Sequence, residues 1–307
     1  MPAVSQESPT ALTDWTAPRT PWGAPDLQGI WDYRTLTPLE RPDQFDGREF
    51  LSNEEIASLE QQRRDRTDGR PPGDPRTAPS VHAPYWLDYG TKVVGSGRSS
   101  LIVDPPDGKI PPLSHEGEQR AAARREARSG LGSADSVEAR NLWERCITRG
   151  LPNGMLPAGY NNNIHVLQTP THVVILNEMI HDARIVPLGE RPPLTDRVRQ
   201  WRGHSRGYWD SDTLVVETTN FSASADFRGA SENLHLEERF RRTGPDTLDY
   251  TFTVSDLTTW TRPWTATFPI ERINSPMYEY ACHEGNQGLL NILTAARVNE
   301  QGADAPR

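Results

Sequence analysis

The sequence has no long apolar run, only two cysteines and no excess of basic residues. A transmembrane helix needs about 20 consecutive apolar residues, so no segment is expected to span a membrane. Two cysteines are too few for a disulfide framework or a cysteine-rich metal site. With 33 Lys and Arg against 42 Asp and Glu, the formal charge is −9. This balance argues against nucleic acid or acidic membranes as the main partner.

Cys146 and Cys282 lie far apart in the sequence. We expect both to be buried free thiols, and a single bridge in an oxidising compartment is the alternative. Residues 1–15 lack the basic start and apolar run of a signal peptide. We therefore expect a cytoplasmic protein, or a periplasmic one if a leader has been removed.

Aromatic residues and turn formers are abundant instead: 9 Trp, 8 Tyr, 7 Phe, 27 Pro and 23 Gly. Large rings supply the apolar area for a packed core, which excludes a disordered chain. Many turns favour short strands over long helices. The chain of 307 residues is long enough to bury such a core.

The chain is expected to fold as one β-barrel domain over residues 26–297. Residues 1–25, rich in Pro, Ser and Thr, read as an extended N-terminal segment, and residues 298–307 as a tail. Capping residues Ser52 and Ser114 begin two predicted helices. The helical insertions are expected around residues 52–66, 114–128 and 136–147.

Strand patterns begin at residues 27–33 and dominate after Asn163. The later predicted strands are 164–168, 172–178, 181–187, 213–219, 236–242, 247–254 and 264–273. No helix-length segment separates them, so consecutive strands must pair antiparallel. The fold class is therefore mainly β, an antiparallel lipocalin-like β-barrel with a few short helices in the N-terminal half.

Residues 203–207 match the G-x-S-x-G pattern of the hydrolase nucleophile elbow. That elbow requires a strand, a sharp turn and a helix. Here a Val-rich strand follows, so we interpret the segment as part of a β-hairpin.

Histidines at 165, 172, 181 and 283 raise the question of a metal site. No H-E-x-x-H or similar spacing accompanies them. We predict no metal and no cofactor, and a metal-dependent hydrolase is kept as an alternative, to be tested by elemental analysis.

Several carboxylates fall in step with apolar strand positions. Glu238 shares a face with Leu236 and Phe240, and Glu178 is in phase with Val174 and Leu176. A carboxylate inside an apolar barrel either pairs with a cation or holds a proton with a raised pKa. Both outcomes suit acid–base chemistry, and a structural ion pair with an internal arginine is the alternative.

Residues 29–31 form the Gly-x-Trp sequence that opens lipocalin-type barrels. Over nearly its whole length the chain resembles an uncharacterised family of bacterial proteins with such a barrel, whose phrases here occupy residues 25–29, 37–42, 104–109, 145–152, 212–221 and 281–286. Relatives often appear exported. Several lipocalin-like bacterial barrels hydrate, isomerise or cleave apolar molecules without a cofactor. The resemblance therefore implies a cavity that can do chemistry.

Our leading hypothesis is a cofactor-independent lyase or isomerase that acts on a small, largely apolar, aromatic substrate in the barrel, such as a lignin-derived aromatic dimer. The expected catalytic residues are Glu178 or Glu238 as base, His181 or His283 as proton donor, and Arg184 and Arg206 as anion stabilisers. The expected substrate-binding residues are Trp209, Trp264, Tyr250, Tyr280 and Asn220. The alternative is a non-enzymatic carrier of a hydrophobic molecule, and a homodimer is a further expectation.

Overall fold

A computed structural model describes residues 15–68, 88–189, 192, 194–225 and 227–303. Its strands are β1 (Gly29–Asp32), β2 (Ile102–Asp104), β3 (Asn163–Gln168), β4 (His172–Asn177), β5 (Asp182–Pro187), β6 (His204–Asp210), β7 (Thr213–Thr219), β8 (His235–Arg242), β9 (Thr247–Ser255) and β10 (Trp264–Ile273). The helices are α1 (Asn53–Asp68), α2 (His115–Ala127) and α3 (Gly288–Ala303), with short 3-10 turns η1 (Asp43–Phe45), η3 (Asn153–Met155) and η4 (Met179–His181). Over these residues, none of the helices combines the length and the apolar character that a membrane crossing needs.

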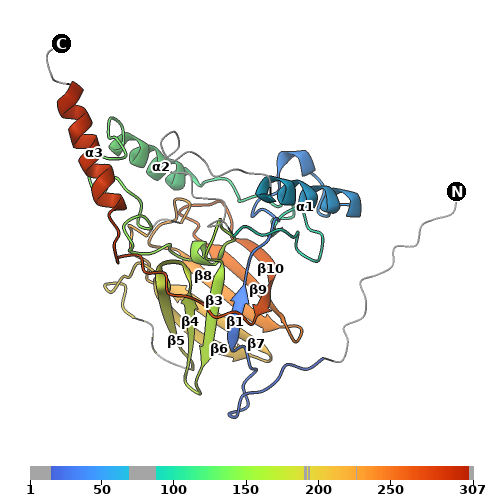
Figure 1. Ribbon diagram of the computed structural model, residues 1–307. Helices are drawn as coiled ribbons and strands as arrows, with labels where there is room; N and C mark the ends of the chain where they lie inside the picture. The colour runs from blue at the N-terminus through green and yellow to red at the C-terminus, as the bar shows by residue number, and fades with distance from the viewer. Residues whose placement is uncertain (1–14, 69–87, 190–191, 193, 226, 304–307) are drawn as a thin grey trace.

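The strands form one antiparallel sheet in the order β5-β4-β3-β1-β10-β9-β8-β7-β6, with β2 added to β10. The end strands approach each other, and residue 188, just after β5, makes a bridge with Gly207 of β6. The sheet is thus a nearly closed barrel (Figure 1). The predicted fold class is confirmed.

The first strand connects the two parts of the meander because β1 lies between β3 and β10. Trp31, the aromatic residue of the Gly-x-Trp sequence, is fully buried, and its indole Nε1 donates to Leu27 O at 2.9 Å. The Arg242 guanidinium lies over this ring at 5.7 Å and donates to Asp26 O at 3.0 Å. This end of the barrel is therefore closed by the N-terminal segment.

The barrel interior is filled with side chains. Strands β8–β10 turn every second residue inward, namely Leu236, Glu238, Phe240, Arg242, Leu248, Tyr250, Phe252, Val254, Trp264, Ala266, Phe268 and Ile270. The rings of Phe240 and Phe268 lie 4.9 and 5.4 Å from that of Tyr250. Such contacts give the interior the close packing of a core.

Helices α1 and α2 lie near their predicted places, and both begin at the expected caps. Ser52 Oγ accepts from Glu55 N at 3.3 Å, while Ser52 N donates to Glu55 Oε2 at 2.9 Å, which completes a capping box. Ser114 Oγ accepts from Gly117 N at 3.0 Å. Figure 1 shows α1, α2 and α3 at one end of the barrel, which we call the mouth.

Two predicted boundaries are wrong. Residues 136–147 form successive turns rather than a helix, and Ser136 and Asn141 each cap one of these turns by accepting from the backbone N–H of Ala139 and Glu144. The predicted tail from residue 298 instead belongs to α3 as far as Ala303. The remaining tail residues, and residues 1–14 of the N-terminal segment, lie outside the described part.

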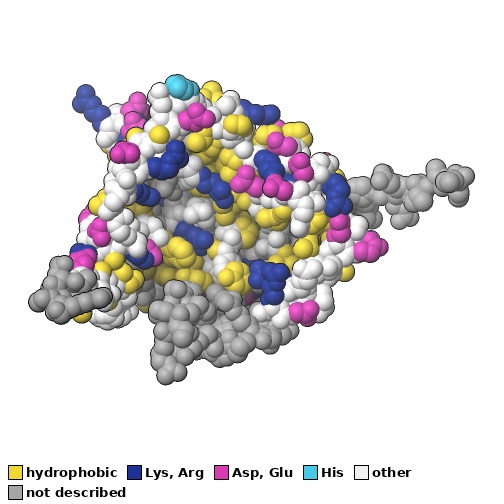
Figure 2. Space-filling view, turned by 90° about the horizontal axis from the view of Figure 1, so that it is seen from above, with side chains coloured by type: hydrophobic (Ala, Val, Ile, Leu, Met, Phe, Trp, Pro, Cys, Tyr) yellow, Lys and Arg dark blue, Asp and Glu magenta, His cyan; other side chains and the backbone are white. Residues whose placement is uncertain are grey.

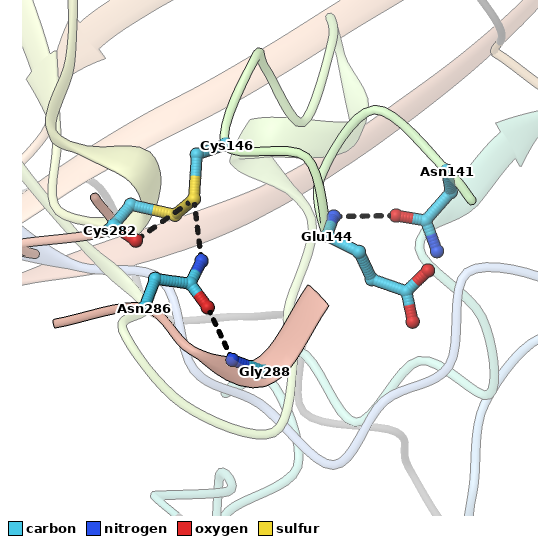
Figure 3. The surroundings of a disulfide bond; sticks show 6 residues. All are labelled: Asn141, Glu144, Cys146, Cys282, Asn286 and Gly288. Atoms are coloured by element: carbon cyan, nitrogen blue, oxygen red, sulfur yellow. Dashed lines mark hydrogen bonds between the residues drawn. A yellow bond between two sulfur atoms is a disulfide. The ribbon is translucent and has the colours of Figure 1, made fainter. Parts of the chain in front are cut away.

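The expectation of free thiols is also wrong, because Cys146 and Cys282 form a disulfide with their Cα atoms 5.8 Å apart. Asn286 Nδ2 donates to Sγ of Cys146 at 3.4 Å, and Asn286 Oδ1 accepts from Gly288 N at 3.2 Å (Figure 3). The bridge therefore ties the loop before η3 to the base of α3. Spacing alone did not reveal this, since the two segments meet only in the folded chain.

The G-x-S-x-G segment runs into β6, whose extent the sequence did not predict. Ser205 is buried on the strand and shares a hydrogen bond of 2.8 Å with Thr218 Oγ1. Its hydroxyl is therefore held between two strands, which agrees with the β interpretation.

Candidate functional site

The predicted base Glu238 lies inside the barrel and is completely buried. Arg184 forms an ion pair with both of its oxygens, with Nη2 at 3.0 Å from Oε1, and Tyr250 OH donates to Oε1 at 2.9 Å. Burial alone lowers the pKa of Arg184, but the carboxylate outweighs it and raises the pKa overall. Burial and then Glu238 raise the pKa of Tyr250 well above its ordinary value. The Glu238 carboxylate is therefore paired and hydrogen-bonded, although Nε of Arg184 is buried without a hydrogen-bond partner in the described chain. This ion pair is the structural alternative considered above.

Of the predicted ring-binding residues, Trp264 and Tyr250 belong to the core. The Trp264 ring lies 5.7 Å from Phe252 and 6.0 Å from both Trp260 and Phe227. Neither ring is exposed. Both side chains therefore contribute to the packing of the core.

Glu178 was expected on the inward face of β4, but the inward residues are Val173, Ile175 and Asn177. Val174 and Leu176 point outward, so the predicted phase was wrong. Glu178 lies just after the strand, at the mouth, where it is buried and accepts from Asn163 Nδ2 at 2.8 Å.

The other predicted catalytic residues are dispersed. His181 and His283 are both exposed, one after β4 and the other in the segment before α3. Arg206 is half-buried on β6 opposite Glu217. The structure therefore does not bring Glu238 and the two histidines into one cavity.

Three predicted substrate-binding residues have different surroundings. Trp209 is half-buried against the core, and Tyr280 is half-buried near the disulfide. Asn220 is buried with a φ of 58°, and its Nδ2 donates to Thr195 O and Val198 O at 3.0 Å each. Asn220 therefore holds the loop that contains Thr195 and Val198.

Among the described residues, no three His, Cys, Asp or Glu side chains gather closely enough to hold a metal ion.

A cavity of about 380 Å³ lies at the mouth of the barrel. It is lined by the segment after β1, by α1 and by the loop around η3, through residues Thr35, Leu36, Thr37, Pro38, Leu39, Arg63, Tyr89, Gly90, Leu101, Arg149, Asn153, Leu156, Pro157, Ala158, Gly159 and Arg228. Figure 2, which looks onto the mouth, shows a hollow where Lys and Arg side chains gather among hydrophobic ones. We call this space the mouth cavity.

The wall around η3 is held by polar side chains from the barrel. Tyr33 OH and Asn177 Nδ2 both donate to Gly154 O, at 3.0 and 2.9 Å. Asn162 closes the following loop, because its side chain accepts from Ala158 N at 2.7 Å and donates to Ala158 O at 3.0 Å. This wall is therefore preorganised.

Arg149 supplies a cation to the wall. Its guanidinium lies 5.0 Å from the Trp143 ring, and its Nη1 is buried without a hydrogen-bond partner in the described chain. Burial lowers the pKa of Arg149, and the phenols of Tyr33, Tyr160 and Tyr280 oppose this effect. Burial, followed by the influence of Tyr280, raises the pKa of Tyr160 to about 12. Burial also raises the pKa of Tyr33, so the phenols of Tyr33 and Tyr160 are both neutral near pH 7.

A second cavity of about 240 Å³ adjoins the first and shares Thr35, Tyr89 and Gly90 with it. Four of its five charged lining groups in the described chain are already paired, since Arg34 forms ion pairs with Asp32 and Asp88, and Lys92 forms one with Glu60. The mouth cavity is therefore the better candidate site.

The sequence analysis did not select Arg149, Arg63, Arg228 or Tyr89. One signal was present, because the predicted resemblance to a bacterial family rests in part on residues 145–152 and 281–286. The Cys146–Cys282 bridge joins these phrases. Predicting that pairing would have placed Tyr280 near Arg149.

Comparison with family models, curated proteins and solved structures found no match to this chain. The resemblance to a bacterial family therefore remains a prediction. The candidate site depends on geometry alone.

Proposed function

We propose that the protein binds a small organic molecule in the mouth cavity. The observation that carries this proposal is the cavity itself, whose volume of about 380 Å³ falls within the usual range for ligand pockets, roughly 300–1,000 Å³. Its wall combines apolar residues such as Leu36 and Leu156 with the ring of Tyr89 and a few polar groups. That combination is typical of small-molecule sites.

This proposal shifts the ligand from the interior to the mouth. Large inward-facing side chains occupy the interior, so a ligand there would have to displace rings that pack 4.9–5.7 Å apart. The carrier hypothesis fits the mouth cavity directly, since a carrier needs walls but no paired acid and base.

An acid–base lyase or isomerase is the second candidate, and one observation favours it. Glu178 is buried at the mouth, and both Glu178 and Arg149 influence the pKa of Tyr33, so all three lie at the same end of the barrel. Burial is the main cause that raises the pKa of Tyr33. Glu178 therefore lies at the same end of the barrel as the mouth cavity, although the described residues that line the cavity do not include it.

The disulfide supports a proposal about location. Such bonds persist mainly in oxidising compartments. We therefore propose that the protein works in an oxidising compartment, such as a periplasm, rather than in the cytoplasm.

The test is ligand-observed NMR with a library of small aromatic and aliphatic compounds. Ala158 lines the cavity, and its backbone makes the loop-closing hydrogen bonds, so Ala158→Trp fills the space without removing them. We expect compounds that bind the wild-type protein to lose binding in this variant. Ala183→Trp, on the exposed side of β5, is the control and should bind normally.

Binding that persists in Ala158→Trp, or the absence of any binder in the library, would contradict the proposal. Chromatography of each bound compound after incubation separates the two candidates. A carrier returns its ligand unchanged, whereas an enzyme yields a product.

A further inference from the structure

Arg149 is a cation in the cavity wall for which the described residues supply no counter-charge. Within the described chain its Nη1 atom is buried and lacks a hydrogen-bond partner, and no carboxylate forms an ion pair with it. A buried charge is costly unless it is paired and hydrogen-bonded. The raised pKa values of Tyr33 and Tyr160 keep these two phenols neutral, so they supply dipoles but no negative charge.

The other two arginines of the wall have different surroundings. Arg228 forms an ion pair of 3.6 Å with Glu40, so its charge is balanced. The Arg63 guanidinium lies 4.4 Å from the centre of the Tyr89 ring, in cation–π contact. Arg149 also contacts a ring, that of Trp143 at 5.0 Å, but its buried Nη1 has no hydrogen-bond partner in the described chain. Arg149 is therefore the cation best placed to receive an anion from outside the chain.

The described residues in the rest of the mouth-cavity wall carry little negative charge. Among the described residues that line the cavity there is no Asp or Glu, although the whole chain carries a net charge of −9. An anion entering the cavity therefore meets cations and apolar groups. Its carboxylate would supply the counter-charge that Arg149 lacks.

We propose that the ligand of the mouth cavity is an organic carboxylate, whose carboxylate pairs with Arg149 while its hydrocarbon or ring portion packs against Leu36, Leu156 and Tyr89. This inference rests on the proposed binding function and names its ligand class. The planar guanidinium matches a carboxylate through two parallel hydrogen bonds. The apolar wall suits the remainder of such a molecule.

The experiment uses matched pairs of compounds: aryl and alkyl carboxylic acids, each with its methyl ester. Binding to the full chain is measured by ligand-observed NMR and calorimetry at pH 7 and low salt. We expect the acids to bind at least about ten-fold more tightly than their esters. Raising the salt concentration should weaken acid binding and leave ester binding unchanged.

Variants of Arg149 then test whether its positive charge binds the carboxylate. Arg149→Met should weaken acid binding by about ten- to a hundred-fold and leave ester binding unchanged, and Arg149→Lys should restore part of the loss. Arg145→Met, four residues earlier in the same loop, is the matched control and should behave like the wild type. The unfolding midpoint of each variant shows whether the fold is intact.

The outcomes separate the two proposals. If acids and esters bind equally well and Ala158→Trp abolishes both, the cavity is a ligand site but the carboxylate inference is wrong. If acid binding survives Arg149→Met, the assignment to Arg149 is wrong. If neither acids nor esters bind the wild-type protein, the proposed binding function fails together with the inference.

Discussion

Among single residues, Glu238 shows most clearly how a buried charge is made tolerable. The carboxylate is fully buried, yet Arg184 neutralises it and Tyr250 donates a further hydrogen bond. A buried ion pair of this kind adds little net stability over an apolar pair, but removing one partner leaves the other uncompensated. The sequence predicted the inward orientation correctly because strand side chains alternate, and the identity of the partner came only from the fold.

Glu238→Gln is expected to lower the free energy of unfolding by about 3–5 kcal/mol, because Arg184 would remain charged inside the barrel. Chemical denaturation at pH 7 measures the change. The control is Glu237→Gln on the outward face, where the Glu237–Arg239 pair is partly exposed. That change should cost less than about 1 kcal/mol.

Replacing both partners sharpens this prediction. Glu238→Leu combined with Arg184→Met removes both charges, so the double variant should be more stable than either single variant. Equal losses in the double variant and the single variants would mean that packing volume, not charge, controls this position.

At the scale of elements, the disulfide links parts of the chain that the sheet does not hold. Cys146 lies in the turn-rich segment before η3, and Cys282 precedes α3. Arg149 follows the first cysteine by three residues, and Tyr280 precedes the second by two. The bridge thus keeps the segment that carries Tyr280 beside the wall of the mouth cavity.

We expect the paired change Cys146→Ser and Cys282→Ser to lower the free energy of unfolding by about 2–5 kcal/mol, because the unfolded chain loses a long closed loop. Denaturation with and without a thiol reductant measures this. Reductant should bring the wild-type protein to the stability of the double variant and leave the variant itself unchanged. A double variant as stable as the oxidised wild type would show that the bridge contributes nothing.

At the scale of the whole molecule, the barrel could be predicted because its strands are short, alternating and separated by turns. Seven strands after Asn163 fall near their expected positions, and β1 pairs as the antiparallel meander requires. Strand β6 was missed because Gly203 and Gly207 weaken the strand signal. Helix α3 was not predicted, because the expected end of the barrel domain at residue 297 falls inside it.

The candidate site could not be predicted in the same way. Its wall joins residues 35–39, Arg63, Tyr89, residues 149–159 and Arg228, which approach one another only after the barrel has closed. Sequence reasoning favours residues that cluster in the chain, such as Glu178 and His181. An unpaired cation is recognisable only once its neighbours are known.

Closure of the barrel depends on the contact between its two end strands. Gly207 of β6 faces β5, and a Cβ atom there would lie 3.0 Å from Leu188 Cδ2 and Val186 Cγ1. A side chain at this position therefore requires the side-chain ends of Leu188 and Val186 to move, and a branched one crowds the contact between the end strands. We expect Gly207→Val to lower the free energy of unfolding by about 1–3 kcal/mol, measured by chemical denaturation.

Gly95→Val is the control, because a Cβ at Gly95 meets nothing within 4 Å. This substitution should change the free energy of unfolding by no more than about 0.5 kcal/mol. Equal effects of the two substitutions would mean that the gap between β5 and β6 accommodates a side chain and that close contact there does not close the barrel.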